Sequence, residues 1–206
     1  MLDHHDHPHA AVEEDENAHS YYQILGQAVK ELLIEKGILT ADEIRGMIEF
    51  RDSITPAMGA GIVARAWTDA AFKQRLLADG SEAIREFGLD MGGVRLAVVE
   101  NTPQIHNVIV CTLCSCYPRG VLGLPPAWYK NRDYRARVVR EPRRVLGEFG
   151  LVLPGNVEVR VHDSTADMRY LVLPMQPAGT EGKSEAELAA LVSRDCMIGV
   201  AVPRAR

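Results

Sequence analysis

Apolar side chains recur every three or four positions through the first ninety residues, which is the spacing of amphipathic helices. The first stripe predicts a helix over 21–36, which Gly37 ends. Thr40 and Glu43 match a capping box, so they predict a second helix that runs to about Arg51. The remaining stripes predict helices over 56–67 and 69–78, the latter with Thr68 as N-cap, and a short turn over 81–88 capped by Ser81. Because short helices are marginal alone, we expect this helical arm, residues 21–90, to pack on a partner subunit.

After Gly92 the pattern changes to β-branched and apolar runs that are typical of strands. They predict strands over 94–99, 105–110, 157–161 and 168–173, the last two as a hairpin across 163–165. Gly and Pro residues predict an irregular loop over 120–126, and start and stop signals predict helices over 142–150 and 184–193. The pattern therefore predicts an α+β fold in which the arm precedes an α+β domain, residues 91–206.

The first twenty residues differ from the rest of the chain. They carry five His and six acidic residues with few apolar ones, so they cannot bury enough surface to offset the entropy of ordering. We expect a disordered His-rich tail over 1–20. Its histidines could chelate a passing divalent metal, but a flexible tail organises no catalytic geometry.

Composition narrows the class of protein. The chain has 206 residues, of which 47% are hydrophobic, and a net charge of −5, values typical of a folded globular protein. No long Lys/Arg block provides the positive surface that nucleic acids require, so we expect no nucleic-acid partner. The sequence has no run of about 18 apolar residues and no basic-then-apolar leader, so we expect a soluble cytoplasmic protein without membrane contact.

Three of the four cysteines, Cys111, Cys114 and Cys116, fall within six residues directly after the strand predicted over 105–110. Thiolates favour zinc, iron–sulfur clusters or soft transition metals over magnesium or calcium. A four-iron cluster would need a fourth thiolate at a spacing that the sequence lacks, and a redox disulfide would leave one cysteine unexplained. Cysteines that only fill space in a core are common, but three of them rarely fall so close together in the sequence. A zinc site would need a fourth ligand, for which the candidates are Cys196, His106 and His162.

The close spacing also permits the backbone to supply ligands. If the Cys116 sulfur binds an ion, its own amide nitrogen lies one small chelate ring away and that of Ser115 lies one further ring away. Deprotonating two peptide amides is costly, so this arrangement requires a strong Lewis acid such as trivalent cobalt or iron. Such an ion can polarise a nitrile or activate a water.

The segment 110–117, VCTLCSCY, resembles the metal-binding motif of the nitrile hydratase α subunit. The resemblance extends over most of the chain and leaves only the tail outside. It implies a layered α-β-β-α order for the domain that follows the helical arm. The further segments that carry it are 31–37 (ELLIEKG), 64–67 (ARAW), 106–110 (HNVIV), 123–130 (GLPPAWYK), 134–140 (YRARVVR) and 194–199 (RDCMIG).

This resemblance implies an αβ heterodimer, or its α2β2 dimer, that hydrates small nitriles to amides. Every metal ligand would come from this chain, namely the sulfurs of Cys111, Cys114 and Cys116 and the backbone amides of Ser115 and Cys116. Cys114 would be oxidised to sulfinate and Cys116 to sulfenate. Catalysis would centre on Cys114, Ser115 and Cys116, with the metal polarising the nitrile or activating water, and with the sulfenate oxygen as nucleophile or base.

The resemblance also indicates the metal and its surroundings. Thr112 and Tyr117 resemble the cobalt form of the family, which implies one Co(III) per α subunit rather than Fe(III), with a cobalt-loading chaperone as a further partner. Two arginines of the β subunit would hold the oxidised sulfurs. Around the metal or in the substrate pocket the resemblance places Asp163, Ser164, Arg169, Trp128, Thr112 and Tyr117. Without it, the first three would be a polar surface turn and Trp128 ordinary packing.

Two alternatives stay open. The metal-bearing γ subunit of thiocyanate hydrolase shares the CTLCSCYP motif, so the cysteine residues do not separate the two enzymes. The segment 123–130 resembles nitrile hydratase more than thiocyanate hydrolase, whereas a cysteine like Cys196 also occurs in thiocyanate hydrolase. The other alternative is a non-catalytic zinc-binding interaction module, in which the thiols only stabilise a fold.

Overall fold

The computed structural model describes residues 20–205, so the predicted His-rich tail lies outside the described residues apart from Ser20. Backbone contacts divide the chain between Ile48 and Glu49 into an N-terminal unit and a larger compact unit. The division falls well before residue 90, where the sequence pattern changes from helix to strand. None of the helices in the described part is both long and apolar enough to cross a membrane.

The N-terminal unit contains helix α1 (Tyr21–Glu35) and the start of α2 (Ala41–Ser53). Both of these predicted helices are present. The Thr40 N–H donates to the Glu43 carboxylate at 2.7 Å and the Glu43 N–H donates to the Thr40 hydroxyl at 3.1 Å, which confirms the capping box. Ser20 and Gln23 form a second box at the start of α1. No residue of α1 or α2 is buried.

After the last residues of α2, the compact unit continues with four helical elements. They are α3 (Pro56–Thr68), α4 (Ala70–Ala78), α5 (Gly80–Ala83) and the 3-10 turn η1 (Ile84–Phe87). The prediction that Thr68 caps α4 is wrong, because Asp69 accepts the first N–H groups of that helix while the Thr68 hydroxyl donates back to Ala64. Ser81 is likewise not the cap of its turn: Asp79 caps α5, and the Ser81 hydroxyl accepts the N–H of Leu96 instead.

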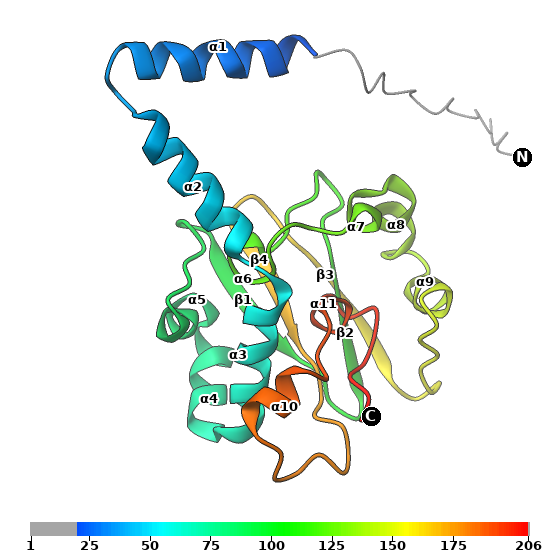
Figure 1. Ribbon diagram of the computed structural model, residues 1–206. Coiled ribbons are helices and arrows are strands. Elements are labelled where there is room, and N and C mark those ends of the chain that lie inside the picture. The colour runs from blue at the N-terminus through cyan, green and yellow to red at the C-terminus, as the bar shows by residue number, and fades with distance from the viewer. Residues whose placement is uncertain (1–19, 206) are drawn as a thin grey trace, which may run out of the picture. The chain divides into compact units, whose positions relative to one another are not determined.

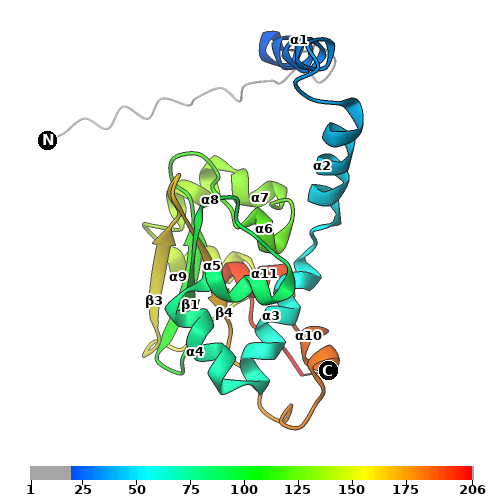
Figure 2. The same ribbon diagram turned by 90° about the vertical axis from the view of Figure 1, so that its left-hand side faces the viewer.

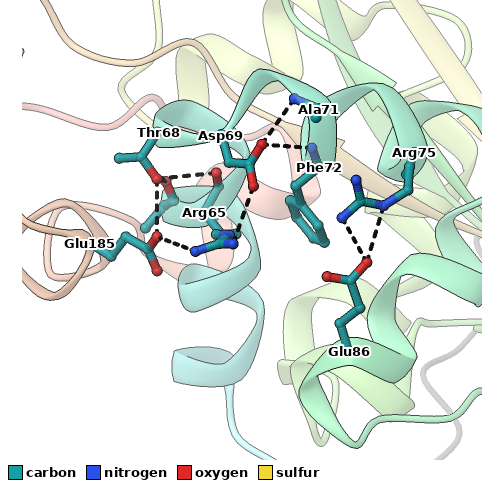
Figure 3. A network of polar contacts seen from close by, with 9 residues as sticks. Arg65, Thr68, Asp69, Ala71, Phe72, Arg75, Glu86 and Glu185 are labelled. Atoms are coloured by element: carbon teal, nitrogen blue, oxygen red, sulfur yellow. Dashed lines mark hydrogen bonds and ion pairs between the residues drawn. The ribbon is translucent and has the colours of Figure 1, made fainter.

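A polar network joins α3 to the helix α10 (Glu185–Ala189) near the other end of the chain (Figure 3). Glu185 accepts from Arg65 and from the Thr68 hydroxyl, each at 3.1 Å. These groups are exposed, so the network fixes the placement of α10 more than it adds stability. The helix predicted over 184–193 ends early, at Ala189, and a separate helix α11 (Arg194–Ile198) follows it.

The four strands form two parallel pairs rather than a hairpin. They are β1 (Arg95–Glu100), β2 (Ile105–Val110), β3 (Glu158–Asp163) and β4 (Met168–Leu173). Strand β1 pairs with β4, and β2 pairs with β3. The predicted hairpin across 163–165 is wrong, because these residues carry the chain from one sheet to the other. This pairing buries the apolar ends of β2 and β4, residues 108–110 and 171–173, where the two sheets contact each other.

Helices cover the outer sides of the two sheets. Helices α4 and α5 contact β1, whereas α9 (Pro142–Glu148), which the sequence predicts over 142–150, contacts β3. Figure 1 shows α4 and α5 at the left of the compact unit and α9 at its right, with the strands between them, and in the turned view of Figure 2 α4 and α5 face the viewer. The fold is α+β, as predicted, with sheets between helices.

Three short helices occupy the region between β2 and α9. They are α6 (Arg119–Leu122), α7 (Ala127–Lys130) and α8 (Arg132–Arg137). The first of them lies partly within the predicted loop 120–126, and the sequence pattern did not indicate any of the three. Gly123 ends α6 at φ +68°, and a Cβ there would lie 2.2 Å from the Ile54 carbonyl oxygen. Only glycine fits this close contact, which holds α6 against the start of α3.

Candidate metal centre

The cysteine cluster lies on the loop that follows β2, residues 111–116. Strand β2 is buried from His106 to Val110 and delivers the chain to Cys111, which is buried as well. The loop then turns to the surface, where Leu113 is 88% exposed and Cys114 is exposed. The loop therefore runs from the core to an open face of the molecule.

The three sulfurs of the loop converge. The Sγ atoms of Cys111 and Cys114 lie 3.5 Å apart, those of Cys114 and Cys116 lie 3.1 Å apart, and all three lie within 4.8 Å of one another. None of the three forms a disulfide. The predicted sulfur ligands are thus brought together in a group that could hold a metal ion.

Within residues 20–205 this group includes no fourth His, Cys or carboxylate side chain. The three candidates for a fourth zinc ligand have other partners. His106 Nε2 lies 2.7 Å from the Gly199 carbonyl oxygen, His162 Nε2 lies 2.8 Å from Asn107 Oδ1, and Cys196 lies 3.2 Å from the Ser193 hydroxyl. A zinc site with four His, Cys or carboxylate ligands is therefore not formed by the described residues.

The protein environment gives the thiols different proton affinities. Burial alone would raise the pKa of Cys111, but the N–H groups of Cys114 and Cys116 face its sulfur and, with the Cys114 thiol, lower that pKa to about 7. Burial, together with the hydrogen bonds in which the Cys116 S–H donates to the sulfurs of Cys114 and Cys111, raises the pKa of Cys116 to about 12, against the opposing charge of Arg169. Cys111 is thus the first of these two to become a thiolate ligand.

Three residues predicted to surround the metal gather at the end of β3 and the start of β4. Asp163, paired in register with Val110, accepts the Thr112 N–H at 2.9 Å and the Thr112 hydroxyl at 2.5 Å. The Ser164 N–H donates to the Val110 carbonyl at 2.7 Å, which continues the ladder beyond β3. Arg169 donates to the carbonyl oxygens of its own turn, and its charge acts on Cys116. All three therefore border the cysteine loop.

The two predicted aromatic residues are packed rather than open. The Trp128 ring lies 4.9 Å from the Tyr134 ring and 4.7 Å from the Phe149 ring, edge-on to both. Tyr117 is buried edge-on to Tyr129 at 5.0 Å. Burial raises its pKa, and its hydroxyl has no hydrogen-bond partner among residues 20–205. The proposed contribution of Trp128 to a substrate pocket stays a prediction.

Three side chains from α7 and α8 hold the backbone of the cysteine loop and of the end of β2, and the sequence analysis assigned no role to any of them. The Tyr129 hydroxyl donates to the Cys116 carbonyl at 2.8 Å, and the Tyr134 hydroxyl donates to the Ile109 carbonyl at 2.7 Å. Arg135 donates to three successive loop carbonyls. No residue pattern distinguishes Arg135 from its neighbours, because a segment rich in arginine is typical of a solvated helix face.

A sequence model of the family described as "Nitrile hydratase, alpha chain" matches residues 20–201. The chain belongs to the nitrile hydratase alpha chain family. The low-molecular weight cobalt-containing nitrile hydratase subunit alpha of Rhodococcus rhodochrous is 53% identical over 179 residues, 86% of each chain. The family resemblance carried by the VCTLCSCY segment is thereby confirmed.

Two further relatives of this nitrile hydratase family chain bear on the alternatives. The thiocyanate hydrolase subunit gamma of Thiobacillus thioparus is 44% identical over 197 residues, covering 90% of this chain and 81% of that one. A solved structure of a double mutant of Fe-type nitrile hydratase from Comamonas testosteroni Ni1 matches with a TM-score of 0.79 and 43% identity, over 88% of this chain and 90% of that one. Members with different metals and substrates are therefore similar to this chain.

Proposed function

We propose that this chain is the metal-bearing α subunit of a cobalt nitrile hydratase, which adds water to R–C≡N to give the amide R–CO–NH2. The observation that carries the proposal is the convergence of three sulfurs within 4.8 Å, on an exposed loop, in a chain of this family. A nitrile is small and has a single polar atom, so an open site with one electrophilic centre suits it.

The residues that would hold Co(III) are Cys111, Cys114 and Cys116 through sulfur, and Ser115 and Cys116 through their backbone nitrogens. The short sulfur separations support the first part, and the second part rests on the family resemblance of the segment 110–117. When bound, the ion supplies a Lewis acid that polarises the nitrile or activates a water. The cobalt-containing relative at 53% identity favours cobalt over the iron of the Fe-type structure at 43%.

The remaining residues have supporting roles in this proposal. Oxidation of Cys114 to sulfinate and of Cys116 to sulfenate would place negative charge where the Arg169 guanidinium already acts on Cys116. Asp163 holds the loop through Thr112. A β subunit would cover the exposed loop and supply the arginines that complete the site, and a loading chaperone would deliver cobalt.

A second candidate is the metal-bearing γ subunit of a thiocyanate hydrolase, which the 44% identity over 90% of this chain favours. The same sulfur group would serve that reaction, so only the substrate distinguishes the two functions.

The test is metal analysis and the mass of the peptide spanning residues 111–116, on protein co-expressed with its β subunit. We expect nearly one cobalt per chain, one cysteine carrying two oxygens and another carrying one. Assays with propionitrile, benzonitrile and thiocyanate then name the substrate. Turnover of thiocyanate but not of either nitrile would favour the second candidate. Zinc on unmodified thiols, with no activity after cobalt reconstitution, would instead favour a zinc-binding interaction module.

A further inference from the structure

The side chain of Arg135 lies along the carbonyl edge of the cysteine loop. Its Nε donates to the Cys111 carbonyl at 3.0 Å, and its Nη2 donates to the Thr112 carbonyl at 2.9 Å and to the Leu113 carbonyl at 2.8 Å. One guanidinium thus binds three successive peptide groups of the segment that leads into the sulfur group. Among residues 20–205 it has no carboxylate partner, so its charge is directed at these carbonyls alone.

The neighbouring arginines differ in their contacts. Arg137, on the same helix α8, forms ion pairs with Glu141 and Glu148. Arg132, also on α8, is exposed and forms no hydrogen bond or ion pair through its side chain with the described residues. It borders the same open depression as Arg135 and Thr112. Arg132 is therefore a matched reference for a positive charge close to the loop but without contact to its backbone.

The three hydrogen bonds of Arg135 act on the N–H groups that organise the loop. The Cys111 carbonyl belongs to the same peptide group as the Thr112 N–H, which donates to Asp163 at 2.9 Å. The Leu113 carbonyl belongs to the same peptide group as the Cys114 N–H, which donates to the Cys111 sulfur at 3.3 Å. A cation on a carbonyl oxygen polarises its peptide group and strengthens the N–H of that group as a donor.

We propose that Arg135 is a positioning residue of the metal centre, which fixes the carbonyl edge of residues 111–113 so that the Cys111 sulfur and the turn 114–116 converge before a metal binds. Asp163 holds the N–H side of Thr112 while Arg135 holds the carbonyl side. The segment is thus fixed between a carboxylate of β3 and a guanidinium of α8. The consequence for metal binding rests on the proposed function, whereas the ordering of the loop does not.

The shape of the side chain explains why this position is arginine. The guanidinium is planar and presents its donors as a rigid fork, so Nε and Nη2 reach different carbonyls together. A lysine ammonium is a single point charge on a flexible chain and cannot hold three carbonyls in one geometry. Arg135→Lys therefore keeps the charge but loses most of the geometry, and Arg135→Gln loses both.

The test compares Arg135→Gln, Arg135→Lys and the control Arg132→Gln, each in the full chain co-expressed with its β subunit. Cobalt per chain, cobalt release to a chelator and the visible sulfur-to-cobalt absorption are measured. Removing a partner that orients metal ligands typically weakens metal binding by roughly 10–100-fold. We expect a loss of that size and a shifted absorption in Arg135→Gln, a smaller loss in Arg135→Lys, and wild-type behaviour in Arg132→Gln.

Amide hydrogen exchange on the metal-free α–β complex tests the ordering of the loop separately. The Thr112 and Cys114 amides should exchange faster in Arg135→Gln than in wild type or Arg132→Gln. If wild-type protein binds no cobalt while this difference persists, the proposed function fails and the positioning role stands. Wild-type exchange and wild-type cobalt retention in Arg135→Gln would overturn the role, as would equal losses in Arg132→Gln. Should Arg135→Gln not fold, Arg135→Ala with added methylguanidinium replaces it, and absence of rescue would overturn the role.

Discussion

Two exposed parts of the chain, residues 20–48 and the cysteine loop 111–116, are held by contacts of opposite range. The capping hydrogen bonds of α1 and α2 join residues three positions apart. The loop instead contacts Arg135, 22 to 24 positions away, and Asp163, 51 positions from Thr112. The loop is therefore only as ordered as the compact unit that carries it, whereas the helices are ordered by their own sequence.

Capping orders the two N-terminal helices, but it does not bury their apolar side chains. Ile24 is 60% exposed and Leu32 is 48% exposed, and neither helix buries a residue. Helices gain most of their stability from packing an apolar face, so these two lie at the low end of local stability in the chain alone. That they pack on a β subunit stays a prediction, which this exposed apolar surface supports.

The largest effect is expected at the cysteine loop, where Cys114→Ala removes one of the three sulfur ligands of the proposed metal centre. This substitution removes the sulfur that lies within 3.5 Å of Cys111 Sγ and 3.1 Å of Cys116 Sγ, so we expect cobalt retention and nitrile hydration to be lost together. Metal content and propionitrile turnover of the α–β complex measure the effect. Leu113→Ala, at a position 88% exposed on the same loop, should keep both properties. Full activity of Cys114→Ala without cobalt or iron would refute the proposed metal centre.

The next largest effect is a difference in the free energy of unfolding between a substitution in the compact unit and one in the N-terminal unit. Phe72 of α4 is fully buried against the compact core, so Phe72→Ala should lower the free energy of unfolding by about 3–5 kcal/mol. Leu32→Ala on α1 should change it by less than about 0.5 kcal/mol in the isolated chain. Urea unfolding of both variants gives the two values. If Leu32→Ala were as damaging as Phe72→Ala, α1 would be part of the folded core of the isolated chain.

The same difference in range explains which elements the sequence predicts. The start of α2 and the capping boxes follow from residues three apart, and their predictions are confirmed. The strands were also predicted, but the pairing predicted for the last two, a hairpin, was wrong, because parallel pairing joins residues such as Val110 and Asp163 far apart in the sequence. The cap of α4 was misassigned by one residue. Thr68 and Asp69 are both favourable N-cap residues, and only the position at which the helix begins selects Asp69.

The candidate site divides in the same way. The three cysteines fall within six residues of the sequence, so this short spacing predicts that their sulfurs converge, as they do within 4.8 Å. Family resemblance singled out Asp163, whose contact with Thr112 crosses two strands. Arg135 could not be predicted from residue type, because its function depends on how α8 packs on the loop. Side chains that hold a backbone from a distance leave no local pattern in the sequence.

A smaller effect concerns acid stability of the compact unit. Burial lowers the pKa of His106 below its ordinary 6.5, against the opposing hydrogen bond to the Gly199 carbonyl. The unfolded chain therefore binds the proton more readily, so this contribution to stability is full above about pH 6.5 and declines below it, by up to about 1.4 kcal/mol per pH unit. The free energy of unfolding in urea, at pH values on either side of 6.5, measures the decline. His106→Gln should show a smaller decline, and equal declines in both proteins would contradict the assignment.

The smallest effect sharpens the comparison most directly, because the chain contains the same capping box in both units. Thr40 and Glu43 cap α2, and Ser184 and Glu187 cap α10 of the compact unit. Removing a capping hydroxyl typically weakens the first turn roughly fivefold. Thr40→Ala should therefore speed amide exchange in the first turn of α2 by about that factor and leave the urea midpoint unchanged. Ser184→Ala should lower that midpoint slightly, because α10 is tied to α3 through Glu185. A lowered midpoint in Thr40→Ala would mean that the N-terminal helices unfold together with the compact unit, and the distinction between local and distant support would fail.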